Sequence, residues 1–171
     1  MIQIAFEPAF DPFHTTFRLL QQLEYRGRQQ VEIARLKILD VFVAEPRRCM
    51  DIRLPLNLKK VGKSAAACQS ATYGHRPSKQ VFFNRMVPIQ NAALQTLVMK
   101  KFLDDVEFQK GFALRTIQPL PDELRHRIEE VNGVELALLD FLVNKLDVIP
   151  FHGLGGLKDR TGLGEYRYDL V

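Results

Sequence analysis

The chain has 171 residues, which is enough for one hydrophobic core and short for two, because independent domains usually need about 100 to 150 residues each. Its hydrophobic fraction of 46% and charged fraction of 26% exclude a disordered chain. The formal net charge of +4 permits contact with nucleic acid or an acidic partner without requiring it. We therefore expect one domain spanning residues 1–171.

The sequence carries no signal that would direct the chain into or across a membrane. The first residues lack the charged leader and continuous apolar stretch of a secretion signal, and no apolar run approaches the about 18 residues of a bilayer span. Cys49 and Cys68 form neither a disulfide framework nor a paired metal motif, so we interpret both as reduced thiols. These features predict a cytoplasmic protein.

Alternating apolar and polar residues predict a short strand at each end of the chain, over 2–6 and 166–170. Pairing of these two strands in one small sheet is an arrangement that the pattern allows. Between them, Asp11 and Pro12 form a helix start, because the carboxylate accepts from free backbone donors and proline at the first position loses no hydrogen bond. This start predicts a helix through about residue 25.

A second helix is predicted over 29–45, where apolar residues recur at spacings of three and four on more than one face. Such a wide apolar surface indicates a central helix, and Pro46 marks its end. Residues 47–80 show little periodicity and form a poorly patterned insertion. A helical pattern returns over 81–86, and Pro88 is expected to open a new helix that ends near Lys100 and Lys101.

Residues 102–118 are predicted to form a β-hairpin, with Lys110 in the turn and alternating apolar residues on the return strand. Two helices followed by a hairpin are typical of a winged helix. A further helix should start at Asp122, and the pair at 132–133 should separate it from a last helix. The predicted fold is α+β and predominantly helical, with a winged-helix-like core.

No arrangement of residues predicts catalysis, a metal or a cofactor. The four histidines are isolated, and His126 with Glu130 is only an i,i+4 pair on a predicted solvated face. The glycine-rich segment 153–158 lacks the Gly-Lys-Ser/Thr ending of a phosphate-binding loop. We therefore expect a non-enzymatic protein with no small-molecule substrate. An enzyme using His14 with Asp11 as an acid–base pair is the remaining catalytic alternative.

Positive charge is the one feature that suggests a macromolecular ligand. The basic residues form a phosphate-binding surface if the fold brings them together, whereas the modest net charge favours scattered, solvated cations. In a free-standing winged-helix DNA-binding regulator, the helix 88–101 would enter the major groove and the hairpin would contact the minor groove or backbone. The candidate DNA-contacting residues are Arg85, Lys100, Lys101 and Lys110.

Three segments have sequences that are more distinctive than their hydrophobic periodicity alone. They are FDPFHTTFRLL at 10–20, MVPIQNAAL at 86–94 and LKDRTGLGEYRYD at 157–169. Together they resemble the small middle components of bacterial ABC three-component conflict systems, a group that includes the Lamassu-like anti-phage and anti-plasmid systems. The resemblance extends from the first helix to the C-terminus.

The resemblance implies an accessory subunit that acts beside an SMC-type ABC ATPase and an effector protein such as a nuclease. In such a system the ATPase senses double-stranded DNA, and the middle component helps to hold the effector inactive. Under this hypothesis, the partner-binding candidates lie at the first helix and the C-terminal end: Phe13, His14, Phe17, Arg160, Glu165, Tyr166 and Arg167. Spacing alone favours core packing for the phenylalanines, with partner docking as the alternative.

Overall fold

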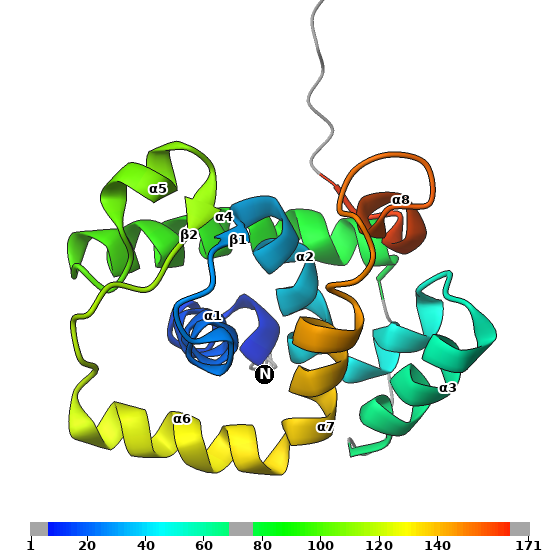
Figure 1. Ribbon diagram of the computed structural model, residues 1–171, viewed down its shortest axis with the longest axis horizontal. Coiled ribbons are helices and arrows are strands. Elements are labelled where there is room, and N and C mark those ends of the chain that lie inside the picture. The colour runs from blue at the N-terminus through cyan, green and yellow to red at the C-terminus, as the bar shows by residue number, and fades with distance from the viewer. Residues whose placement is uncertain (1–6, 69–76, 165–171) are drawn as a thin grey trace, which may run out of the picture.

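A computed structural model describes residues 7–68 and 77–164 of the chain (Figure 1). In chain order its helical elements are η1 (Pro8–Phe10), α1 (Pro12–Arg26), α2 (Ile33–Ala44), η2 (Pro46–Asp51), α3 (Leu56–Ala65), η3 (Ala66–Cys68), α4 (Lys79–Met99), α5 (Asp105–Gln109), α6 (Asp122–Val134), α7 (Leu136–Leu139), the π-helical η4 (Asp140–Lys145) and α8 (Leu157–Thr161). Strands β1 (Val31–Glu32) and β2 (Phe112–Ala113) pair antiparallel, with Val31 opposite Ala113. The predominantly helical α+β prediction is confirmed.

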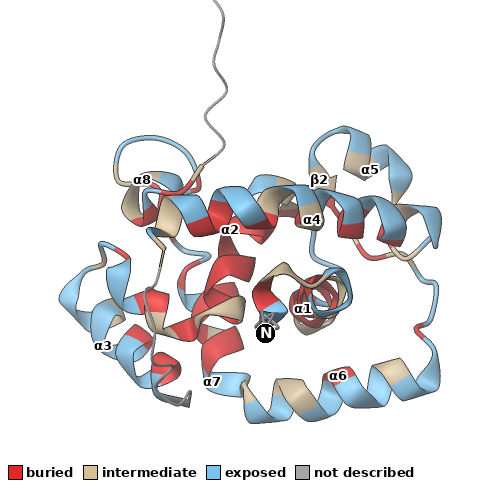
Figure 2. Ribbon diagram, turned by 180° about the vertical axis from the view of Figure 1, so that it is seen from behind, coloured by how far each residue is buried: buried red, intermediate tan, exposed pale blue. Residues whose placement is uncertain are grey.

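The core lies around α1, α2 and α4 (Figures 1 and 2). Helix α2 is buried at every position from 35 to 43, which confirms the prediction of a central helix. One apolar cluster joins α2 and α4 to α3, η4 and α8, and the other joins α1 and α4 to α6 and the strands. Helix α1 packs between α4 and α6. None of the helices in the described ranges has both the length and the apolar composition that a membrane span needs.

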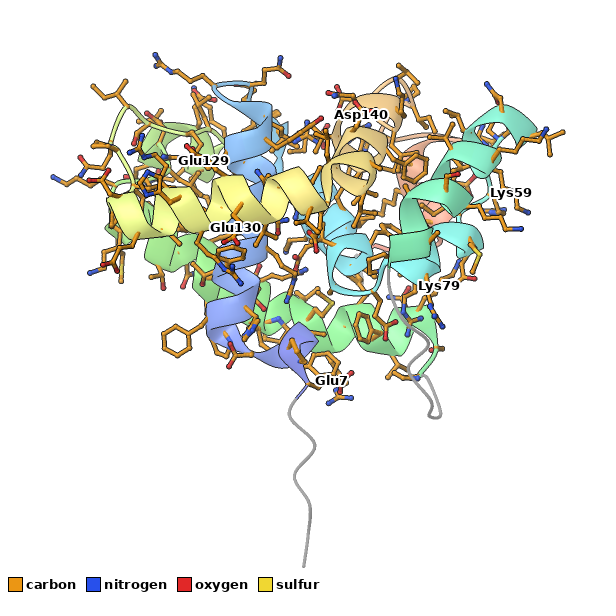
Figure 3. The ribbon with its side chains drawn as sticks, turned by 90° about the horizontal axis from the view of Figure 1, so that it is seen from below. Glu7, Lys59, Lys79, Glu129, Glu130 and Asp140 are labelled. Carbon is orange, nitrogen blue, oxygen red and sulfur yellow. The ribbon has the colours of Figure 1, made fainter. Side chains whose placement is uncertain are left out.

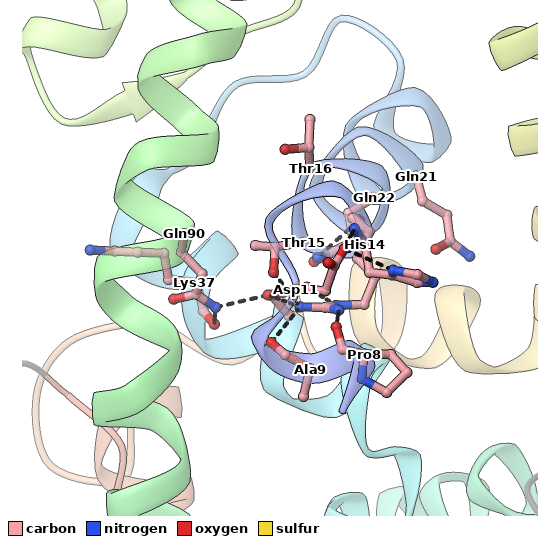
Figure 4. A network of polar contacts seen from close by, with 12 residues as sticks. Pro8, Ala9, Asp11, His14, Thr15, Thr16, Gln21, Gln22, Lys37 and Gln90 are labelled. Atoms are coloured by element: carbon pink, nitrogen blue, oxygen red, sulfur yellow. Dashed lines mark hydrogen bonds and ion pairs between the residues drawn. The ribbon is translucent and has the colours of Figure 1, made fainter. Parts of the chain in front are cut away.

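A buried ion pair fixes α1 against α2 and α4 (Figure 4). Arg18 Nε donates to Asp40 Oδ1 at 2.8 Å, and its Nη2 donates to Asp40 Oδ2 at 3.1 Å. Gln90 Nε2, from α4, donates to the same Oδ2 at 2.9 Å. Arg18 Nη1 also donates to the carbonyl of Pro8 at 3.0 Å, which ties η1 to the network. The charges are therefore paired and hydrogen-bonded, as burial of ionised groups requires.

The first helix follows the prediction, and the second begins later than expected. Asp11 Oδ1 accepts a hydrogen bond from His14 N at 2.9 Å, and α1 ends at Arg26, where Gly27 adopts a φ of 64°. Residues 29–32 were expected to belong to the second helix. Val31 and Glu32 instead form β1, because they pair with β2.

Helix α4 is continuous through Pro88, so the prediction of two separate helices was wrong. A proline inside a helix removes one backbone hydrogen bond and costs about 3 kcal/mol. The segment before Pro88 buries Phe82 and Phe83, and the segment after it buries Leu94 and Leu97. Each such side chain contributes about 1.5–3 kcal/mol on burial, which offsets the cost of the interruption.

The predicted hairpin at 102–118 is present only as a loop closed by a bridge. Leu103 and Arg115 form an antiparallel bridge, and Asp104 N donates to the carbonyl of Leu114 at 2.9 Å. Helix α5 occupies the loop, where Asp104 caps it by accepting from Glu107 N at 2.9 Å. Strand β2 instead pairs with β1, where Val31 and its partner Ala113, 82 positions later in the chain, are both buried.

Two further boundaries differ from the predictions. The poorly patterned insertion contains η2, α3 and η3, and α3 was not predicted. The pair at 132–133 does not end a helix, since α6 continues to Val134, whose side chain is exposed, and the boundary falls at Glu135. The predicted terminal strands over 2–6 and 166–170 lie outside the described residues.

Candidate functional site

The first two turns of α1 contain three of the candidate partner-binding residues: Phe13, His14 and Phe17. Phe13 is 84% exposed, whereas Phe17 is half-buried and packs against the apolar cluster of α1 and α4. Core packing therefore accounts for Phe17 but leaves Phe13 at the surface. A large exposed aromatic side chain at a helix start is a potential anchor for a protein partner.

His14 lies beside Phe13 and contacts the helix cap. Its Nδ1 lies 2.9 Å from Asp11 Oδ1, the oxygen that also accepts from His14 N. The backbone N–H of His14, and then its side chain, hold the pKa of Asp11 below the usual aspartate value. The pair proposed as an acid–base alternative is thus part of a helix cap. Among the described residues, no cluster of three or more His, Cys, Asp or Glu side chains is placed to hold a metal ion.

Arg160 holds the end of the described chain against the segment after η2. Its Nε donates to the carbonyl of Gly155 at 2.6 Å, and its Nη1 donates to the carbonyl of Arg53 at 2.8 Å. Arg53 N donates in return to the carbonyl of Arg160 at 3.1 Å. Arg160 therefore fixes the glycine-rich loop that precedes α8. The other C-terminal candidates, Glu165, Tyr166 and Arg167, lie outside the described residues.

The four candidate DNA-contacting residues are spread along α4 and into the loop that follows it. Arg85 stacks over the ring of Phe10 at 3.9 Å, and Lys110 forms an ion pair of 2.7 Å with Glu107. Lys100 and Lys101 follow the last residue of α4, 15 and 16 residues beyond Arg85. At 1.5 Å per residue they lie about 22 Å from it along the helix axis.

A cluster of two buried arginines was not predicted from the sequence. Asp147 Oδ1 lies 2.8 Å from Arg35 Nη1 and 3.5 Å from Arg26 Nη1. Arg26 is buried, which lowers its pKa, and its Nε and Nη2 have no hydrogen-bond partner among the described residues. An open pocket of about 280 Å³ borders both arginines. Only the fold brings these residues together, because Arg35 and Asp147 are 112 positions apart.

The fold and these side chains define a small helical protein, in which the candidate residues for binding a partner or DNA are aromatic and basic. Residues 4–169 match the family model of the ABC-three component (ABC-3C) system Middle Component 5, and because this match spans nearly the whole chain, the chain belongs to that family. It is therefore a middle component with an accessory role and protein partners. No curated protein and no solved structure matched the chain.

The family match confirms the resemblance to ABC three-component middle components. The finer expectations, a Lamassu-like system with an SMC-type ATPase and a nuclease effector, stay predictions.

Proposed function

We propose that the chain is a non-catalytic adaptor that bridges or regulates a DNA-sensing SMC-type ATPase and an effector such as a nuclease, in a Lamassu-like defence system. The observation that carries this proposal is membership of the middle-component family over residues 4–169. A middle component is by name one part of a three-component system, so its activity depends on contacts with the other parts. The non-catalytic role agrees with the capping function of Asp11 and His14.

The proposed contact with the ATPase is the exposed first turn of α1. Phe13 lies there with an 84% exposed side chain, and His14 beside it is also exposed. Burial of an exposed phenylalanine contributes about 1.5–3 kcal/mol to association, and such aromatic anchors carry much of the energy of protein interfaces. The turn is held in place by the Asp11 cap and by the hydrogen bond from Arg18 to Pro8.

The test is co-expression of the tagged chain with its neighbouring open reading frames, followed by affinity purification, a high-salt wash and mass spectrometry. The proposal expects recovery of a large ATPase of the SMC type. Recovery of the chain alone at micromolar concentration would overturn it.

A matched pair of variants locates the contact. Phe13→Ala should weaken the affinity for the ATPase by at least about ten-fold, which is the loss that about 1.4 kcal/mol of binding energy produces, and should lower ATPase recovery accordingly. Ile117→Ala is the control, because Ile117 is 83% exposed and follows Arg115, which pairs with Glu24 at the opposite end of α1 from Phe13. Equal recovery with both variants would place the interface elsewhere. Circular dichroism should show both variants folded, since neither side chain belongs to the core.

A further inference from the structure

Positive charge is concentrated in one part of the chain. Residues 47–80 carry a single acidic residue, Asp51, whereas the chain as a whole has an excess of only four cations, so the remainder has a net negative charge. The basic residues of this segment are eight: Arg47, Arg48, Arg53, Lys59, Lys60, Lys63, Arg76 and Lys79. The modest net charge of the whole protein is therefore the sum of a strongly positive segment, 47–80, and a weakly negative remainder.

Helix α3 places three of these cations on one exposed face. Lys59, Lys60 and Lys63 are spaced at i, i+1 and i+4, which puts them within an arc of about 100° on a helix of 3.6 residues per turn. All three are exposed, and Figure 3 shows Lys59 at the outer edge of α3. We call these three residues the lysine face.

The opposite side of α3 fixes the direction of the lysine face. Gly62 packs against the ring of Phe141 in η4, so closely that a Cβ at Gly62 would lie 2.7 Å from Phe141 Cζ. Ala65 is also buried in the core. Because α3 is docked through small residues on this side, its lysines point towards solvent.

The lysine face has no intramolecular counter-charge among the described residues. No ion pair forms at Lys59, Lys60 or Lys63, and α3 itself contains no Asp or Glu. In α6, by contrast, the exposed cations are paired: Arg125 lies 2.9 Å from Asp122 and Arg127 lies 2.6 Å from Glu130. Helix α6 also carries the acidic side chains of Glu129 and Glu130, and it lies at the other side of the molecule from α3 (Figures 1 and 3).

We propose that the lysine face binds the phosphate backbone of double-stranded DNA without reading its sequence. Each lysine that contacts a phosphate displaces condensed counterions, which is the main driving force of non-specific DNA binding. Within the same arc α3 offers only Leu56 besides the lysines, so the face lacks the Asn, Gln and Arg side chains that most often read base edges, and phosphate contact is the mode that it favours. The proposal rests on the proposed function and deepens it, because it lets the middle component itself hold the DNA that the complex senses.

The experiment measures binding of the isolated full-length chain to a fluorescently labelled duplex of mixed sequence, by anisotropy over a series of salt concentrations. The wild-type chain should bind, with an affinity that falls as salt rises. The variant Lys59→Gln/Lys60→Gln/Lys63→Gln should bind at least about ten-fold more weakly, and the slope of log K against log salt should shrink by about two to three.

The control variant removes the same charge from the candidates at the end of α4 and in the following loop. Lys100→Gln/Lys101→Gln/Lys110→Gln should keep the wild-type affinity within about two-fold, because these residues lie outside the lysine face. An equal loss in both variants would assign binding to bulk charge, and a loss in the control alone would assign it to the end of α4. Either result, or no binding by the wild-type chain, overturns the proposal.

Co-purification separates this proposal from the proposed function. The lysine-face variant should still recover the ATPase after a high-salt wash, because Phe13 and not α3 makes that contact. If this variant loses the ATPase, the lysine face binds an acidic protein surface and the DNA proposal is overturned. If the wild-type chain recovers no ATPase but its DNA affinity depends on the lysine face, the proposed function fails and the DNA site stands.

Discussion

Two helical glycines in different surroundings test how α3 is docked. At Gly62 in α3, an added Cβ would lie 2.7 Å from Cζ of Phe141 and 3.2 Å from the two neighbouring ring carbons. At Gly133 in α6, no atom lies within 4 Å of the added Cβ. Replacement of each glycine by alanine therefore makes the same change in helix propensity but a different change in packing.

The two variants are expected to change the free energy of unfolding by different amounts, because only Gly62→Ala adds a packing cost to the gain in helix propensity. Alanine in place of a helical glycine stabilises by about 0.5–1 kcal/mol, so Gly133→Ala should raise the free energy of unfolding by that amount. Gly62→Ala has the same gain but must displace the fully buried Phe141 ring, and such overpacking costs about 1–3 kcal/mol. The propensity terms cancel between the variants. Gly62→Ala should therefore be less stable than Gly133→Ala by about 1–3 kcal/mol.

Urea unfolding followed by circular dichroism measures this difference, provided that the transitions are two-state with equal slopes. Equal stabilisation by both alanines would show that α3 does not press against Phe141, and the reasoning about its docking would be refuted. Destabilisation by Gly133→Ala would contradict the observation that no atom lies near an added Cβ at that position.

Three other changes test the buried and capping charges. Asp40→Asn should destabilise by about 3–5 kcal/mol in urea unfolding, because it leaves the buried Arg18 guanidinium without its counter-charge; an unchanged midpoint would contradict the role of the pair. Arg26→Met should stabilise by about 1 kcal/mol, since two buried donors without partners are removed, and a lower Tm would contradict this. The lowered pKa of Asp11 means that its ionised form stabilises fully above the usual aspartate pKa and is lost as the pH falls through the lowered pKa. The Tm of the wild-type chain should therefore fall more steeply in acid than that of Asp11→Asn, which keeps a cap for His14 but does not titrate, and parallel curves would show that Asp11 has no such effect.

Local sequence signals were sufficient to predict a structural element where neighbouring residues determine it. Asp11 and Pro12 specify the start of α1 through a hydrogen bond and a fixed φ, and both act within one helical turn. The apolar residues of α2 specify a central helix because they cover more than one face. In α4 the same kind of reasoning failed at Pro88, because tertiary packing on both sides outweighed the local cost of proline.

Helix α3 was missed for a different reason. Its buried side is made of Gly62 and Ala65, with Leu58 partly buried, and such small residues give little hydrophobic periodicity. Its three lysines are evident in the sequence, but their spacing places them on one face only if the segment is a helix. The arginine cluster at Asp147 had no sequence signal, because its members come from distant positions.

The two proposed contacts are expected to respond differently to salt. The lysine face acts through charge, so its DNA affinity falls steeply as ions screen the phosphates. Phe13 acts through apolar burial, which salt does not weaken. A high-salt wash should therefore strip DNA from α3 while the ATPase stays bound at α1. Because the two proposed contacts lie on separate elements, both proposals together predict that DNA is released from the middle component while the subunit stays in its complex.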